Sequence, residues 1–425
     1  MSYQRPNGAS GSGSAFSTRR VGRVVLSAKT SMSTWLSRPL ASLHLLLAVF
    51  ALLILFGLVM VLSASSVESL TQGGSPYAVF ARQAGFCLAG LALFWLGLRI
   101  SPQRLRTAAP ALLLITLALL VGVLIPGLGT SIAGARKWYV ISGMSFQPAE
   151  PAKVALALWG AHVLAMRRRV LHFWRFAISP VLPVAVVMLT LVVLQPDLGT
   201  AVSIAIVVVG LLFFSGAPGR LMATLVGGGL LGIVVLGLSA SYRSSRITSF
   251  LSPGADPLGA AYQSTQALYS LADGGLFGVG LGQGRAKWSY LPNASNDFIF
   301  AIIGEELGLV GGFVVIGLFA TLAYVGLRIA ARNTDPWIKI LTGTLTAWLV
   351  GQAAINISYV VGLLPVTGIP LPLISSGGTS LVVTMFVFGV LANAARHEPE
   401  AAAALQRNPA RFTRLLRLAP PGTRI

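Results

Sequence analysis

The sequence predicts an all-α integral membrane protein, a single bundle of about ten transmembrane helices. Composition is the first reason. The 425 residues are 55% hydrophobic and 10% charged, whereas roughly a quarter of the residues of a soluble domain are charged. The second reason is that the mean hydropathy is +0.79 and that apolar runs near the roughly 20 residues needed to cross a bilayer recur along the chain.

Ten apolar runs are candidate spans. The first follows a basic region, as in a signal peptide, but it exceeds the roughly 7 to 15 apolar residues of such a peptide and further runs follow it. The weakest is the fourth, which opens with Pro151 and contains Lys153 and His162. In order, the runs are 44–64, 80–98, 108–125, 151–166, 178–194, 199–215, 221–239, 298–327, 340–362 and 378–395.

Positive charge orients the predicted bundle. Of the 31 Lys and Arg residues, 23 fall in the two tails and in connections of one side such as RRRVLHFWRF (167–176), together with 3 of the 11 acidic residues. Basic residues concentrate on the cytoplasmic side of membrane proteins, so both termini are predicted to be cytoplasmic. The pI of about 11.3 therefore reflects topology rather than affinity for nucleic acid.

The chain divides into three predicted regions. Residues 1–40, rich in Ser, Gly and Arg, are expected to form a disordered basic cytoplasmic tail. Residues 41–397 form the membrane domain, and residues 398–425 form a second basic cytoplasmic tail with one short amphipathic helix.

Three connections are expected on the outward side. Residues 126–150 and 240–297 are long, and the second directly precedes the eighth span. Residues 363–377 contain three prolines and no charge, which predicts a re-entrant segment buried in protein. Functional residues are expected on this face, because long loops on a rigid bundle often carry sites.

Ionisable side chains at membrane depth are functional candidates. The stretch LPNASNDFIFAIIGEELG (291–308) contains three carboxylates. Asp297 is placed at the start of the eighth span, where it either caps the helix or serves as a general base. Glu305 and Glu306 would lie about 12 Å deeper on a continuous helix, and structural pairing with backbone or a basic partner is favoured for both.

Outward basic residues form a second group of candidates. The motif GARKW (134–138) places Arg136 and Lys137 beside Trp138. Basic side chains at this position either extend to the lipid headgroups or bind a substrate. Glu150 and Lys153 are three residues apart and can pair on one helix face.

Two further residues receive structural interpretations. Asp197, in QPDLGT (195–200), is expected to cap a helix. The single Cys87 falls within a span, so an intramolecular disulfide is not possible. Metal-ligand spacing is absent, and no metal site is predicted.

Six motifs in order resemble the shape, elongation, division and sporulation (SEDS) family, the RodA and FtsW proteins. They extend over residues from about 44 to 396, and PLISSGGTS is more similar to the division members, FtsW, than to RodA. The motifs are GARKW, FQPAEPAK, QPDLGT, AYQSTQALYSLADGGLFGVGLGQG (261–284), LPNASNDFIFAIIGEELG and LLPVTGIPLPLISSGGTS (363–380).

The resemblance implies an enzyme of the bacterial cytoplasmic membrane that polymerises lipid II into peptidoglycan glycan strands on the outer face. A class B penicillin-binding protein and other division proteins at the septum are the implied partners. The essential family aspartate falls on Asp297, as the general base, and undecaprenyl pyrophosphate is the leaving group. A divalent cation such as magnesium is left open. The implied substrate-binding positions are Arg136, Lys137, Trp138, Glu150, Lys153, Asp197, Arg243, Arg246 and Gln263.

The chain departs from the family pattern at two places. Before DFIF the family has a sequence closer to LPEAHT, whereas this chain has Asn293, Ser295 and Asn296, so a histidine relay is excluded. Lys137 replaces an arginine that often precedes the tryptophan, so a bidentate phosphate contact would fall to Arg136.

Two other classes of function are left open by the residues. A lipid II flippase would distribute polar groups through the midplane of the membrane. A non-catalytic division scaffold would depend on its tails and spans and would not need Asp297.

Overall fold

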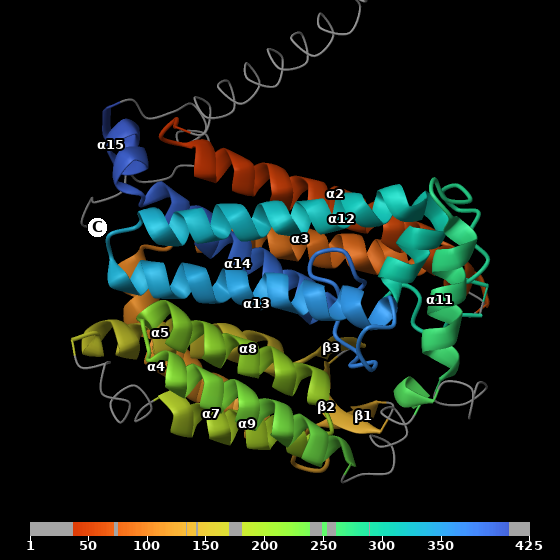
Figure 1. The fold of residues 1–425 in the computed structure, drawn as a ribbon, viewed down its shortest axis with the longest axis horizontal. Coiled ribbons are helices and arrows are strands. Elements are labelled where there is room, and N and C mark those ends of the chain that lie inside the picture. The colour runs from red at the N-terminus through yellow and green to blue at the C-terminus, as the bar shows by residue number, and fades with distance from the viewer. Residues whose placement is uncertain are drawn as a thin grey trace, which may run out of the picture.

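A bundle of long helices forms the body of the protein (Figure 1). The computed structural model describes residues 37–71, 75–132, 134–141, 143–169, 181–238, 249–252, 261–288 and 290–407. The bundle helices in these ranges are α2 (Ala41–Thr71), α3 (Ala78–Arg99), α4 (Pro102–Gly122), α5 (Ala149–Arg167), α7 (Val181–Leu194), α8 (Leu198–Ser215), α9 (Gly219–Leu238), α12 (Ile299–Arg332), α13 (Pro336–Val360) and α14 (Gly378–Arg396).

Each predicted apolar run overlaps one of these helices. Within the described ranges, seven helices are long and apolar enough to cross a membrane. The class of helical membrane protein is therefore confirmed, while the number of crossings stays a prediction. Helix α5 differs from its neighbours because it buries Glu150 and Lys153 near its start.

A small antiparallel sheet departs from the all-helical prediction. Strands β1 (Thr130–Ile132), β2 (Ala135–Ile141) and β3 (Met144–Phe146) occupy the connection between α4 and α5, in the order β1-β2-β3. In Figure 1 the sheet and α11 (Tyr262–Gly274) lie at one end of the bundle, opposite α15 (Pro399–Arg407). The connection is thus folded, and it carries the GARKW motif on β2.

At the end of the bundle that carries α15, the start of α2 and the end of the chain's helical part lie close to the end of α12. Arg328, near the end of α12, donates to Ser42 Oγ at 3.1 Å, and Arg332 pairs with Glu400 of α15 at 3.1 Å. Ala401 of α15 is buried against the bundle, so the second predicted tail begins as a packed helix. Residues 1–36 and 408–425, which hold the rest of the predicted tails, lie outside the described residues.

Helix α12 is broken at Gly308, whose φ of 67° and ψ of −164° are non-helical. The amides of Leu309 and Val310 donate to the carbonyls of Gly275 and Leu276, at 3.0 and 3.2 Å, instead of bonding within the helix. The helix carbonyls that these amides leave, those of Glu305 and Glu306, accept from residues 279 and 280 at 2.9 and 3.0 Å. The loop after α11 is therefore inserted into the helix through exchanged backbone hydrogen bonds.

The two glutamates before the break anchor the same loop. Glu305 accepts the backbone N–H groups of Arg285 and Ala286, at 2.6 and 3.1 Å to Oε1. Glu306 pairs with Lys287 at 2.9 Å, and the exposed fractions of these two side chains are 0% and 3%. These contacts match the structural roles expected for both glutamates.

The segment predicted to be re-entrant, residues 363–377, is non-helical and runs between α13 and α14. Leu371 and Ile374 are buried, and Gln83 of α3 accepts the N–H of Gly377 at 3.2 Å. The Ser375 hydroxyl accepts the N–H of Leu371 at 2.8 Å and donates to the carbonyl of Asn296 at 2.7 Å. The segment is thus held in protein, as predicted.

Breaking the Lys287–Glu306 pair should destabilise the protein strongly. Lys287→Met leaves a buried carboxylate without its cation, a change that typically costs about 3–5 kcal/mol. We expect a large fall in the apparent melting temperature in detergent, and a smaller fall for Lys287→Met/Glu306→Leu, which removes both charges. Glu400→Gln, at an exposed ion pair, is the control and should change little. Equal melting temperatures for Lys287→Met and Glu400→Gln would contradict this account.

Candidate functional site

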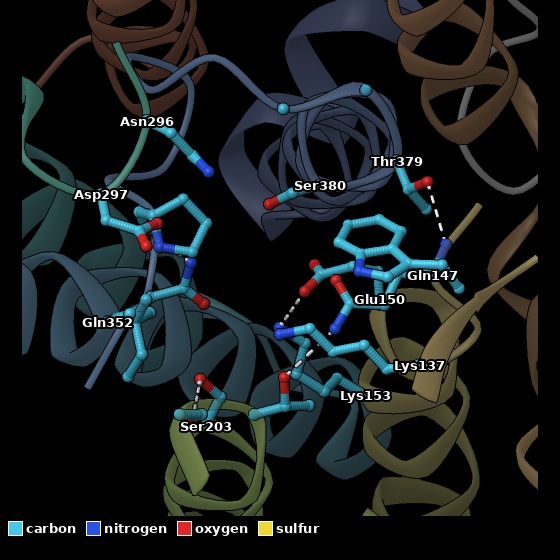
Figure 2. Close-up of a pocket in the computed structure, with 18 of the residues that line it drawn as sticks. Lys137, Gln147, Glu150, Lys153, Ser203, Asn296, Asp297, Gln352, Thr379 and Ser380 are labelled. Carbon is cyan, nitrogen blue, oxygen red and sulfur yellow. Dashed lines mark hydrogen bonds and ion pairs between the residues drawn. The ribbon is translucent and has the colours of Figure 1, made fainter. Parts of the chain in front are cut away.

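A polar cavity of about 120 Å³ lies where α5, α8, α13 and α14 meet β2 and the turn before α12. Figure 2 shows Asp297 on one side of it and Lys137 on the other. The lining residues are Lys137, Trp138, Gln147, Glu150, Lys153, Gly199, Thr200, Ser203, Asn296, Asp297, Gln352, Gly368, Ile369, Pro370, Ser376, Gly377, Gly378, Thr379 and Ser380.

Asp297 reaches the cavity from a turn, not from a helix end. Helix α12 begins at Ile299, and its N-cap residue is Phe298, without a side-chain hydrogen bond. The helix-cap interpretation of Asp297 was therefore wrong, because residues 291–298 fold as turns around Asn293, whose φ is 59°. The carbonyl of Asn293 accepts the amides of Asn296 and Phe298 at 3.0 and 3.3 Å, which shapes the turn.

Lys137 belongs to a polar network at the start of α8. Its Nζ lies 3.0 Å from Oδ2 of Asp197. Asp197 caps α8, as predicted, by accepting the N–H of Thr200 at 3.1 Å, and it also accepts from Gln147 at 3.0 Å. The side chain of Lys137 is 23% exposed, so this ammonium group remains accessible from the cavity.

Lys153 is held more deeply, with 1% of its side chain exposed. It pairs with Oε1 of Glu150 at 2.8 Å, as the spacing predicts, and its Nζ lies 4.7 Å from the ring centroid of Trp348. Trp348 in turn donates to Gln352 at 2.9 Å, and Gln352 donates to the carbonyl of Pro370 at 2.9 Å. The network thus links α5 to the wall of the cavity formed by residues 368–370.

The other sequence-predicted residues separate into three groups. Trp138 lines the cavity beside Lys137, with its ring centroid 5.9 Å from Nζ. Arg136 donates to the carbonyl of Leu124 at 3.4 Å, and neither it nor Gln263 of α11 lines the cavity. Arg243 and Arg246 lie outside the described residues.

Several cavity residues escaped the sequence analysis. Gln352 lines the cavity, and Asn356, one helical turn further along the apolar α13, lies buried behind it; two amides at this spacing mark one polar face within a span. The first turn of α14, Gly378–Ser380, also lines the cavity. These residues belong to the PLISSGGTS motif, which carries part of the family resemblance, but only the fold brings them to the same cavity as β2.

Among the described residues, no group of three or more His, Cys, Asp or Glu side chains could hold a metal ion. Asp197 and Glu150, two acidic residues at the cavity, each pair with a lysine.

A helical membrane protein with a polar cavity at one end of its bundle is the class that fold and site define. The chain belongs to the cell cycle protein family of FtsW, RodA and SpoVE, whose sequence model matches residues 43–400.

Individual relatives agree with this membership. The chain is 50% identical over 394 residues to a protein named probable peptidoglycan glycosyltransferase FtsW of Mycobacterium tuberculosis, covering 92% of this chain and 75% of that protein. A solved structure described as "Structural coordination of polymerization and crosslinking by a peptidoglycan synthase complex" is 29% identical, with a TM-score of 0.68, covering 86% of this chain and 99% of the other. RodA of Thermus thermophilus is 27% identical, with a TM-score of 0.62 and the same two shares.

The two cavity lysines should differ in their effect on stability. Lys153→Met leaves Glu150, whose side chain is 5% exposed, as a buried carboxylate without its cation, and should destabilise the protein by about 3–5 kcal/mol. Lys137→Met should cost less, because Thr200 and Gln147 still donate to Asp197. Apparent melting temperatures in detergent measure the difference, and equal losses would contradict it.

Proposed function

We propose that this protein is a peptidoglycan glycosyltransferase that polymerises lipid II into glycan strands on the outer face of the bacterial cytoplasmic membrane during cell division. Family membership and the names of its relatives support this function. The observation that carries it is the cavity itself, where a carboxylate, Asp297, faces an accessible lysine, Lys137 (Figure 2).

Asp297 is proposed as the general base. Its carboxylate removes the proton of the 4-hydroxyl group on an incoming lipid II sugar as that oxygen attacks the anomeric carbon of the growing strand. The new glycosidic bond forms while the bond from that carbon to the pyrophosphate oxygen breaks. Undecaprenyl pyrophosphate leaves with the electron pair, and the configuration at the anomeric carbon inverts.

Lys137 is proposed to offset the negative charge that develops on the departing pyrophosphate. Both cavity lysines are paired with a carboxylate, but Lys137 keeps 23% of its side chain exposed, whereas Lys153 has only 1% exposed, and this exposure supports the role of Lys137. The second oxygen of Glu150, Oε2, is buried and has no hydrogen-bond partner in the described part of the chain. It is therefore suited to accept a hydroxyl or amide N–H of the sugar, since a buried acceptor left unsatisfied is costly.

A flippase is the alternative that concerns transport. It would require polar groups along a path through the bundle, but the deeper charges near the outward end have structural partners: Glu305 on backbone N–H groups and Glu306 on Lys287. Asp297 and the partly exposed Lys137 line the cavity at one end of the bundle, which favours chemistry on one face.

Partners are part of the proposal. The related structure described as a peptidoglycan synthase complex supports assembly with a cross-linking enzyme, and we propose a class B penicillin-binding protein as that partner. Lipid II and the undecaprenyl-linked strand are the proposed substrates, and the division septum with its other division proteins is the proposed place of action.

Asp297→Asn should abolish polymerisation. The amide keeps the shape of the side chain but cannot accept the proton, and loss of a general base typically lowers the rate by about 10²- to 10⁴-fold. The measurement is glycan formation from lipid II by the full-length protein with its penicillin-binding partner.

Assays in reconstituted vesicles and in cells distinguish a polymerase, a flippase and a scaffold. Labelled lipid II that crosses the membrane without forming glycan would establish the flippase instead of the polymerase. Wild-type polymerisation by folded Asp297→Asn protein would exclude the base role, and normal division by that variant in cells would favour the scaffold.

A further inference from the structure

Two buried side chains of α13 hold the backbone of the Asp297 turn. We propose that Asn356 and Tyr359 are positioning residues for glycosyl transfer, because they fix the main chain at Asp297 against the main chain at Ile369 and thereby aim the Asp297 carboxylate into the cavity. The inference rests on the proposed function, in which Asp297 is the base.

The contacts are short and shared between the two residues. Nδ2 of Asn356 lies 2.9 Å from the carbonyl oxygen of Asp297 and 2.7 Å from that of Ile369. The hydroxyl oxygen of Tyr359 lies 2.7 and 2.9 Å from the same two oxygens, and 2.7 Å from Nδ2 of Asn356. Both side chains are fully buried, at 0% exposure.

Proton counting fixes the orientation of this cluster. The amide group of Asn356 supplies two hydrogens and the hydroxyl group of Tyr359 supplies one, against two carbonyl oxygens with two lone pairs each. Every donor therefore finds an acceptor. Reversing the Asn356 amide would bring its oxygen against both carbonyl oxygens, so only the observed orientation is favourable.

One of the two carbonyls belongs to a segment that lies beside the carboxylate that the reaction needs. Ile369 follows Gly368, which has a φ of 70° and where an added Cβ would lie only 3.4 Å from Oδ2 of Asp297. The segment 368–370 therefore forms the wall directly beside the carboxylate. Because the same two donors bind both main-chain segments, they set the separation between the base and this wall.

Packing against Phe298, the residue after Asp297, also holds the turn in place. The ring of Tyr359 lies edge-to-face on Phe298, with centroids 5.7 Å apart. On the preceding side, Ser375 and the N–H of Ser376 bond the carbonyls of Asn296 and Ser295, at 2.7 and 2.9 Å. A group mounted on a helix is placed more closely than one on a loop, and of these contacts only those of Asn356 and Tyr359 come from a helix.

The test compares four variants of the full-length protein assembled with its partner. Tyr359→Phe keeps the ring and removes only the hydroxyl group, and Asn356→Leu removes the amide donors at similar volume. Asp297→Asn reports on the base itself. Thr344→Val is the matched control, since Thr344 is buried on the same helix and its hydroxyl oxygen has no partner among the described residues.

The expected result is a loss of turnover with binding intact. We expect kcat to fall about tenfold for Tyr359→Phe and about a hundredfold for Asn356→Leu, the size of effect caused by a misplacement near 1 Å. The amount of labelled lipid II bound per folded protein and its Kd should stay close to those of wild type, while the apparent melting temperature should fall modestly because buried carbonyls lose donors. Thr344→Val should match wild type in every measurement.

Two results would overturn the inference. In the first, kcat stays within twofold of wild type in both α13 variants while Asp297→Asn is inactive. In the second, kcat and the amount of lipid II bound fall by the same factor, which indicates a loss of folded protein rather than a misplaced base. Failure of the proposed function is recognised separately, by full activity of Asp297→Asn.

Discussion

The exchange of backbone hydrogen bonds at Gly308 is the constraint on which the cavity end of the bundle depends. In an uninterrupted helix the carbonyls of Glu305 and Glu306 would accept the amides of Leu309 and Val310, but here each group bonds the loop after α11 instead. Unsatisfied backbone groups within a membrane cost several kcal/mol each, so the break and the loop stabilise each other. A non-helical segment can therefore enter this end of the bundle.

That inserted loop is followed along the chain by the turn that carries Asp297. The carboxylates of Glu305 and Glu306 hold the chain at Arg285–Lys287, and residues 290–298 precede α12 and bring Asp297 to the cavity. The buried faces of α13 and the 363–377 segment hold the turn from the other side. The candidate base is thus fixed between elements far apart in sequence, while its own side chain borders the cavity.

The interactions predicted well from sequence are local ones. Glu150 and Lys153 pair because their spacing on one helix brings them together, and Asp197 caps α8 because a carboxylate directly before a helix meets free N–H groups. The same local reasoning failed at Asp297, which resembles a helix cap in sequence. There the long-range contacts of α13 and of the 371–376 segment hold the turn, and the helix begins two residues later. The pairing of Lys137 with Asp197 was also not foreseen, because it joins a strand to a distant helix.

The sequence by itself determined the class of protein, its apolar helices and the acidic and basic residues available for chemistry, because hydropathy, charge bias and motif wording are properties of short stretches. Only the tertiary structure decided which charges are neutralised and which remain accessible. Lys153 is buried against Glu150 and Trp348, while Lys137 retains exposure at the cavity. The environment of a charged group depends on its burial and on the partners that packing brings near it. Neither the burial nor the partners can be read from the neighbouring residues in the sequence.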